Sequence, residues 1–294
     1  MTKPCPPPDP SPRKPRLALP RGATDCHFHV YGPAERFPML ANRDHTTPDA
    51  SPRSARHLFE TLGVERAVIV QPSVYGTDNR RQLDAMAEIG LEMRAVVVIA
   101  PETSDHELAE LHKAGARGAR MIAGERGVIP FSELETIASH IRDMGWHIEF
   151  LIWPDHIVEL EARIDRLPCP FVIDHLAFID ASAGVEQPAF QALLRLAQNE
   201  RCWLKLSAAN RLSTARPPYP DLLPFAAQIR ALGSSRYVWG SDWPHSNFSG
   251  QMPNTTDLLD VLFDWEPDAD ARQRLLVDNL ARLYGFSQAS TGTG

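Results

Sequence analysis

Short apolar runs and longer amphipathic stretches alternate along the chain between residues 23 and 286. Several of the short runs are almost continuously apolar, which is typical of strands buried on both faces of a parallel sheet. The stretches between them repeat apolar residues every three or four positions, as a helix with one buried face does. The eight apolar runs lie at residues 23–30, 66–71, 94–100, 116–122, 146–152, 170–175, 202–207 and 236–242.

Eight strands that alternate with helices predict a (β/α)8 barrel, the TIM-barrel architecture, and the chain length suits this fold. A doubly wound parallel sheet is the structural alternative. The helix expected at 131–145 carries Ser132 at its start and Glu135 three residues later, which predicts a capping box. An amphipathic helix at 268–286 is expected to close the domain.

The two ends of the chain differ in composition from the part between them. The first 20 residues hold eight prolines and lack the apolar segment of a signal peptide. We expect them to form an extended or disordered arm, which could lie against the barrel or against a neighbouring subunit. The expected organisation is a Pro-rich arm at 1–22, a barrel at 23–286 and a flexible tail at 287–294.

The composition excludes several classes of protein. With 294 residues, 43% of them hydrophobic, the chain can bury a large core, and its formal charge of −7 argues against a nucleic-acid partner. No apolar run approaches the roughly 20 residues of a membrane span. The cysteines form no CxxC pair, which favours the reducing cytoplasm over a disulfide framework. A monomer and a homo-oligomer both remain open.

Polar side chains recur where the predicted strands end. His27 and His29 are two residues apart at the end of the first strand and should point to the same face. Each such residue alone could be structural. Together, three histidines and one aspartate at the ends of strands one, six and eight predict an active site at the mouth of the barrel. The full set of strand-end residues is His27, His29, Ser73, Arg120, Arg126, His175, Asn210, Arg211 and Asp242.

Sequence motifs around these residues resemble those of a known enzyme family. The "HxH" at residues 27–29, "IDH" at 173–175 and "GSDWPH" at 240–245 resemble motifs of the amidohydrolase superfamily. The longer stretches "DCHFHVYGPAERFP", "VIVQPSVYGTDN", "FVIDHLAF", "YVWGSDWPHSN" and "LLVDNLARLYGF" resemble one branch of this superfamily in their order and spacing. Within it, residues 22–285 are most similar to the 2-pyrone-4,6-dicarboxylate lactonase branch, to which 4-sulfomuconolactone hydrolase and galactarolactone isomerase are related. The resemblance implies an enzyme that hydrolyses a carboxylic ester bond in a lactone.

The resemblance also implies a role for each matching position. The catalytic residues would be Asp242, His175, His27 and His29. Two departures set this chain apart, because His45 replaces a substrate-binding tyrosine after strand one and Leu151 replaces another at the end of strand five. The substrate-binding positions would be Ser73, Arg120, Arg126, Arg211 and Asn247, with His45 added in this chain.

The resemblance leaves the need for a metal open. Most superfamily members use one or two divalent metals, whereas the pyrone lactonase works without one. The ends of strands four and five add no evident ligand here. We therefore expect catalysis without a cofactor, and one zinc or manganese ion held by His27, His29, His175 and Asp242 is the alternative.

The predicted reaction is the opening of a carboxylated lactone, as in the catabolism of an aromatic compound. Asp242 would accept a proton from water, His175 would stabilise the oxyanion with support from His27 and His29, and arginines would hold the substrate carboxylates. The alternatives are a metal-dependent decarboxylase or hydratase with the same residues, a lactone isomerase, and a catalytically silent binding module. The intact set of four residues argues against the last of these.

Overall fold

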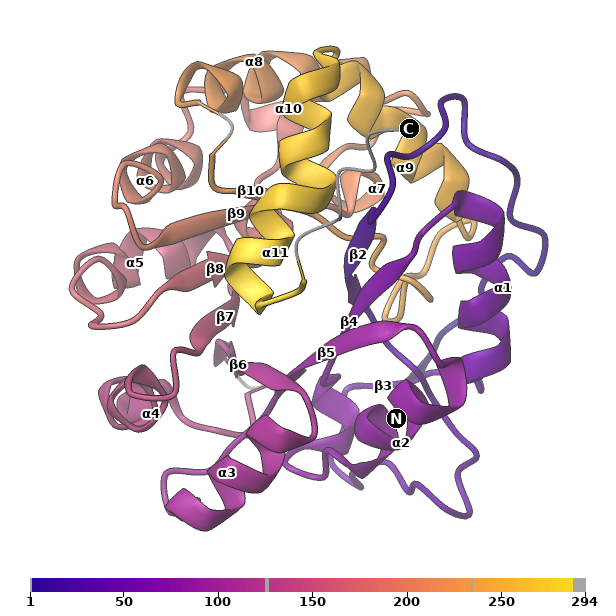
Figure 1. Cartoon of the computed structure of the whole chain (residues 1–294). Coiled ribbons are helices and arrows are strands. Elements are labelled where there is room, and N and C mark those ends of the chain that lie inside the picture. Colours follow the sequence, from indigo (N-terminus) through magenta and orange to yellow (C-terminus); the bar gives the residue numbers. More distant parts are fainter. Residues whose placement is uncertain (1, 125–126, 234, 288–294) are drawn as a thin grey trace.

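A computed structural model describes residues 2–124, 127–233 and 235–287 (Figure 1). Eight parallel strands form one sheet in the order β10-β9-β8-β7-β6-β5-β4-β2. The first and last strands of this order, β10 and β2, lie side by side, and a parallel bridge joins Phe28 of β2 to Trp243 in the loop after β10. The expected barrel fold is thus confirmed. The strands are β2 (Thr24–Phe28), β4 (Arg66–Val70), β5 (Glu92–Val97), β6 (Ala116–Ile122), β7 (His147–Leu151), β8 (Phe171–Ile173), β9 (Cys202–Leu206) and β10 (Tyr237–Trp239).

Helices surround the ring of strands (Figure 1). None in the described ranges is long and apolar enough to cross a membrane. The helices are α1 (Pro52–Leu62), α2 (Arg80–Ile89), α3 (Asp105–Lys113), α4 (Leu134–Arg142), α5 (Pro154–Ile164), α6 (Pro188–Leu196), α7 (Ala209–Leu212), α8 (Leu223–Ala231), α9 (Thr255–Trp265), α10 (Ala269–Gln273) and α11 (Asn279–Tyr284). Shorter helical turns are η1 (Ser73–Tyr75), η3 (Phe131–Glu133), η4 (Asp174–Phe178), η5 (Ala181–Ala183), η6 (Pro220–Leu222) and the π-helical η7 (Arg274–Asp278).

The capping box expected at Ser132 and Glu135 is wrong. Ser132 lies inside the turn η3, and α4 begins after it without a side-chain cap. The carboxylate of Glu135 instead pairs with Arg163 on the next helix, α5. A capping box does form at the start of α3, between Ser104 and Glu107.

The apolar core is divided between the outside and the inside of the barrel. The larger part lies between the strands and the surrounding helices. Inside the barrel, Val68 and Val172 pack against Leu280 and Tyr284 of the last helix. This helix, α11, lies across the ring of strands in Figure 1 and closes one end of it. The polar residues at the strand ends therefore lie at the other end of the barrel, its carboxyl-terminal mouth.

The N-terminal arm lies along the barrel. Its first residues form β1 (Lys3–Pro4), which pairs in parallel with β3 (His45–Thr46) in the loop after the first barrel strand. The backbone N–H of Asn247 donates to Cys5 Sγ over 3.0 Å. Residues 9–16 continue across the start and the exposed side of α9. The arm thus joins two loops of the mouth.

Candidate active site

His27, in β2, and His29, directly after it, lie at the mouth of the barrel. The strand changes register between Asp25 and Phe28, and bulges of this kind re-aim side chains beside active sites. The rings of His27 and His29 are both buried, with centroids 4.9 Å apart. Gly240 permits this arrangement, because a Cβ at that position would lie only 2.5 Å from the Cβ of His27. The two imidazoles share one face, as their spacing predicted.

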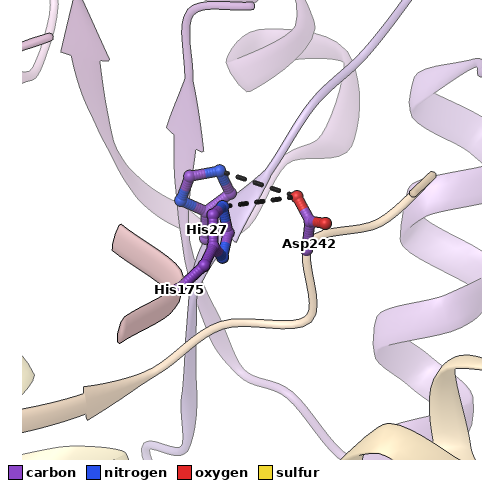
Figure 2. A group of neighbouring side chains, drawn as sticks. All are labelled: His27, His175 and Asp242. Atoms are coloured by element: carbon purple, nitrogen blue, oxygen red, sulfur yellow. Dashed lines mark ion pairs between the residues drawn. The ribbon is translucent and has the colours of Figure 1, made fainter. Parts of the chain in front are cut away.

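Asp242 faces His27 from the loop after β10, and His175 lies beside them at the end of β8 (Figure 2). Asp242 and His175 have positive φ angles, 60° and 50°, which non-glycine residues adopt rarely and at a cost of about 1–3 kcal/mol each. The N–H of Asp242 donates to the carbonyl of His27 over 2.8 Å, which fixes the carboxylate above the strand. Asp242 Oδ1 lies 3.7 Å from Nε2 of His175, 3.8 Å from Nε2 of His27 and 4.0 Å from Nε2 of His29.

These three separations suit an oxygen atom placed between the carboxylate and the rings. They are too long for direct hydrogen bonds, which span about 2.7–3.2 Å. One oxygen at ordinary hydrogen-bond distance could contact Oδ1 of Asp242 and an imidazole nitrogen together. The arrangement can therefore hold a water molecule or a substrate carbonyl beside a carboxylate.

The contacts of the Nδ1 atoms of His29 and His175 determine whether their Nε2 atoms can donate or accept a hydrogen bond. Nδ1 of His29 lies 2.7 Å from the carbonyl oxygen of Val70, which only accepts, so Nδ1 carries the proton. Nε2 of the neutral ring is then an acceptor facing the site. Nδ1 of His175 lies 2.7 Å from Oγ of Ser207, which can either donate or accept.

Burial and nearby charges shift the pKa values of the Asp242 carboxylate and of the imidazoles that face it. Burial would raise the pKa of Asp242, but Arg211 and the nearby imidazoles outweigh it and hold the pKa well below its usual range. Burial lowers the pKa of His175 to about 3 and also takes the pKa of His29 well below its ordinary value. Near neutral pH the site therefore holds an ionised carboxylate and at least two neutral imidazoles.

A buried charged cluster lies directly beneath the mouth. Lys205 of β9 places its Nζ 2.6 Å from Glu149 Oε2, 2.9 Å from Asp174 Oδ1 and 3.0 Å from Nδ1 of His27. All four side chains are fully buried. Arg120 adds a second cation, with its NH2 group 3.4 Å from Asp174 Oδ2.

Sequence reasoning missed this cluster, although a signal was present. Lys205, Glu149 and Asp174 each stand at an interior position of an otherwise apolar strand or at its end. Charged residues in such positions are costly unless they are paired. One cation and two anions on neighbouring strands were therefore evidence for a buried network.

The structure gathers the expected substrate-binding residues around one pocket of about 490 Å³, including its open mouth. Arg211 donates from Nε to Asp242 Oδ2 over 3.1 Å, so it contacts the carboxylate directly. Asn210, its neighbour in sequence, does not contribute to the lining. Arg126 lies outside the described residues. The expected residues that line the pocket are His29, His45, Ser73, Arg120, His175, Arg211, Asp242 and Asn247, together with Leu151 and the unexpected Tyr31, Pro72, Phe178 and Ser246.

One group of possible metal ligands is already filled by a protein cation. Among the described residues, His27, Glu149 and Asp174 bring three ligand atoms within 4.8 Å of one another. The Lys205 ammonium lies between them and contacts all three. A divalent ion would have to displace this ammonium, so the group does not fit a metal.

The second such group within the described part of the chain consists of His27, His175 and Asp242. Its spacing is close to that of metal ligands, but a metal requires a lone pair on Nε2 of His27. An ammonium can only donate, so Lys205 makes Nδ1 the acceptor and leaves the proton of a neutral ring on Nε2. With Lys205 charged, this group fits a hydrogen-bond donor at His27 better than a bound ion.

A closed (β/α)8 barrel with three histidines and an aspartate at its carboxyl-terminal mouth has the form of a barrel enzyme that activates water. Comparison with known proteins agrees with this class. The sequence model described as "Amidohydrolase" matches residues 24–286. The chain belongs to the amidohydrolase family, as its motifs predicted.

The chain aligns with its relatives over nearly its whole length. It is 37% identical over 285 residues to 2-pyrone-4,6-dicarboxylate hydrolase of Comamonas testosteroni, covering 93% of each protein. It is 34% identical over 275 residues to 4-sulfomuconolactone hydrolase of Hydrogenophaga intermedia, covering 92% of this chain and 91% of the relative. The solved structure of a putative 2-pyrone-4,6-dicarboxylic acid hydrolase from Pseudomonas putida superimposes with a TM-score of 0.77 at 28% identity, over 92% of this chain and 100% of that one.

Proposed function

We propose that this protein hydrolyses a lactone that carries carboxylate or other anionic groups. One observation carries the proposal: Oδ1 of Asp242 lies within 4.0 Å of the Nε2 atoms of three imidazoles, at the end of an arginine-lined pocket. The names of two relatives, a pyrone-dicarboxylate hydrolase and a sulfomuconolactone hydrolase, support this substrate class.

In the proposed reaction, Asp242 is the general base. Its ionised carboxylate accepts one proton from water while the water oxygen attacks the lactone carbonyl carbon. The Nε2 lone pair of His29 accepts the second hydrogen of the same water and orients it. This role differs from the oxyanion support expected for His29, because its other ring nitrogen already donates to Val70.

The negative charge that develops on the carbonyl oxygen needs hydrogen-bond donors. Nε2–H of His27 supplies one, and Nε2–H of His175 supplies a second when the Ser207 hydroxyl donates to Nδ1. Donors already in place at such a site typically contribute about 3–4 kcal/mol each to lowering the barrier. When the tetrahedral intermediate collapses, the ring C–O bond breaks, and Asp242 returns its proton to the departing oxygen.

An anionic substrate is favoured by the cations around the pocket. Arg120 and Arg211 both line it, although the chain as a whole carries a formal charge of −7. Arginine binds carboxylate and sulfonate groups through paired hydrogen bonds. His45, Ser73 and Asn247 add polar contacts at the rim.

We also propose that the reaction proceeds without a resident divalent metal. The support is the Lys205 ammonium, which lies in one of the two candidate ligand groups and donates to the histidine common to both. We further propose that the protein is cytoplasmic. The support is that its four cysteines are buried and form no disulfide.

The test is to incubate the purified protein with 2-pyrone-4,6-dicarboxylate and with 4-sulfomuconolactone, and to identify products by chromatography and mass spectrometry. We expect a ring-opened acid, heavier than the lactone by one water. The Asp242→Asn variant should lose at least about 100-fold in kcat, the usual effect of removing a general base, while still binding substrate.

Two results would contradict the proposal. One is an isomeric lactone as the sole product, since that product has the same mass as the substrate. The other is near-normal turnover by Asp242→Asn, which would remove the carboxylate from the role of base.

A further inference from the structure

We infer that Lys205 is a positioning residue that keeps a proton on Nε2 of His27, so that this nitrogen can donate to the oxyanion. The inference rests on the proposed function for the oxyanion, but the position of the proton can be measured without any substrate. Lys205 lies beneath the pocket and does not line it, so it would act through its neighbours, of which His27 faces Asp242.

Each N–H group of the Lys205 ammonium has a hydrogen-bond acceptor nearby. It has three N–H groups and three near neighbours, at 2.6 Å for Glu149 Oε2, 2.9 Å for Asp174 Oδ1 and 3.0 Å for Nδ1 of His27. Lys205 is fully buried, so water does not compete for these contacts. Each donor therefore has one acceptor.

The acceptor at His27 determines where its proton lies. If a neutral His27 carried its proton on Nδ1, that N–H would face the ammonium 3.0 Å away, and one Lys205 donor would lose its partner. If the ring is doubly protonated, its Nδ1–H can turn to Glu149 Oε1 at 3.3 Å or Asp174 Oδ1 at 3.5 Å. The doubly protonated ring also leaves one Lys205 donor without Nδ1, but its Nε2–H faces the ionised carboxylate of Asp242 at 3.8 Å. A neutral ring protonated on Nδ1 would turn a lone pair toward that carboxylate instead, so the two favoured forms both carry a proton on Nε2.

The cluster keeps Lys205 charged despite its burial. Burial alone would lower the pKa of Lys205, but the two carboxylates outweigh it and leave the pKa above its ordinary value. Arg120 pairs with the second oxygen of Asp174 and so shares that carboxylate with Lys205. The network thus provides a fixed positive charge beneath His27.

The competing explanation is that Lys205 only joins strands β7, β8 and β9 through its ion pairs. Two single variants separate the explanations. Lys205→Met removes the donor to His27 and one charge, whereas Glu149→Gln removes one charge from the same ion pair and leaves that donor in place. A purely structural ion pair predicts similar losses in both variants, while positioning predicts a loss specific to Lys205→Met.

The first measurement is the protonation of His27 in substrate-free protein, by two-bond ¹H–¹⁵N correlation spectra of histidine-labelled samples. The His27 signals would be identified by their disappearance in His27→Gln. We expect the wild type and Glu149→Gln to carry a proton on Nε2. A wild-type His27 protonated only on Nδ1 would overturn the inference.

The second measurement is steady-state lactone hydrolysis. Lys205→Met should lower kcat by about 100-fold, the effect of losing one oxyanion donor, with little change in KM. Glu149→Gln should retain most of its kcat. Equal losses in the two variants, or an unchanged kcat in Lys205→Met, would overturn the inference.

A buried carboxylate that loses its partner can prevent folding, so a charge-balanced variant is included. Lys205→Met/Glu149→Gln removes one charge of each sign and leaves Asp174 paired with Arg120. It should fold and show the kcat loss of Lys205→Met, and a folded double variant with normal kcat would contradict the inference. Should the protein open no lactone, the proposed function fails, while the spectra still decide the position of the proton.

Discussion

Arg211 binds one oxygen of Asp242 and leaves the other facing the histidines: its Nε donates to Oδ2 over 3.1 Å, and Oδ1 lies 3.7 Å from His175. The guanidinium also donates to the carbonyl of Ser246 over 2.6 Å, which anchors it to the loop after β10. The pair therefore orients the carboxylate and stabilises its ionised form.

This pair predicts the effect of Arg211→Gln on pH dependence. Burial raises the pKa of Asp242, and Arg211 is the foremost group that lowers it, so the variant should have a higher pKa at this carboxyl. The base must be ionised, so the fall of kcat/KM at acid pH should move to higher pH. Profiles from about pH 3 to pH 8 would show this as an acid limb in the variant where the wild type is still active.

Arg216→Gln is the matched control, because Arg216 is exposed and nearby in sequence, and the charge change is the same. Its profile should follow the wild type. If Arg211→Gln and the wild type lose activity at the same pH, Arg211 does not control Asp242.

The N-terminal arm predicts a second effect, on substrate binding. The arm pairs with the strand that contains His45 and accepts the N–H of Asn247 at Cys5, and both of these residues line the pocket. Removing residues 1–8 should raise KM severalfold and change kcat little, because the groups around Asp242 keep their contacts.

Steady-state kinetics of the truncated protein would test this. Arg16→Ala is the control, because Arg16 anchors the arm to Asp264 on α9, away from the lining residues. It should change KM less than the truncation does. A truncated protein with the wild-type KM would show that the arm does not shape the pocket.

Buried histidines predict the pH dependence of stability. Burial lowers the pKa of His147 to about 4 in the folded protein, from an ordinary value near 6.5. Between these values the unfolded chain binds a proton that the folded protein does not, so acidification destabilises the fold. Loss of this group should flatten the dependence by up to about 1.4 kcal/mol per pH unit.

His147→Phe tests this, because it keeps an aromatic ring beside Tyr284, whose ring centroid is 5.0 Å away. Urea unfolding between about pH 5 and pH 7 would give the free energy of unfolding of both proteins. A variant with the same slope as the wild type would mean that His147 is protonated equally in the folded and unfolded states.

The strands and the mouth of the barrel could be predicted because local pattern determines them. The runs that contain Val68 and Val172 are apolar on both faces, as a barrel strand requires, and such runs stand out between amphipathic helices. Because all parallel strands end at one mouth, the positions of His27, His175 and Asp242 followed from the topology.

Contacts between distant side chains could not be predicted in the same way. Whether Glu135 caps its own helix or pairs with Arg163 depends on how two helices pack. The same holds for the contact between Arg211 Nε and Asp242, which depends on how the loops after β9 and β10 lie against each other. Lys205 could be recognised only as an unusual charge in a strand, since its partners lie on β7, just after β8 and on β2.

The central claim is that Asp242 activates water for lactone hydrolysis with no resident metal. The most direct test is to measure the metal content of the purified protein by plasma mass spectrometry, with lactone hydrolysis assayed before and after chelation. The account predicts far less than one zinc or manganese ion per chain and unchanged hydrolysis after chelation. A stoichiometric metal ion whose removal abolishes hydrolysis and whose return restores it would contradict the account.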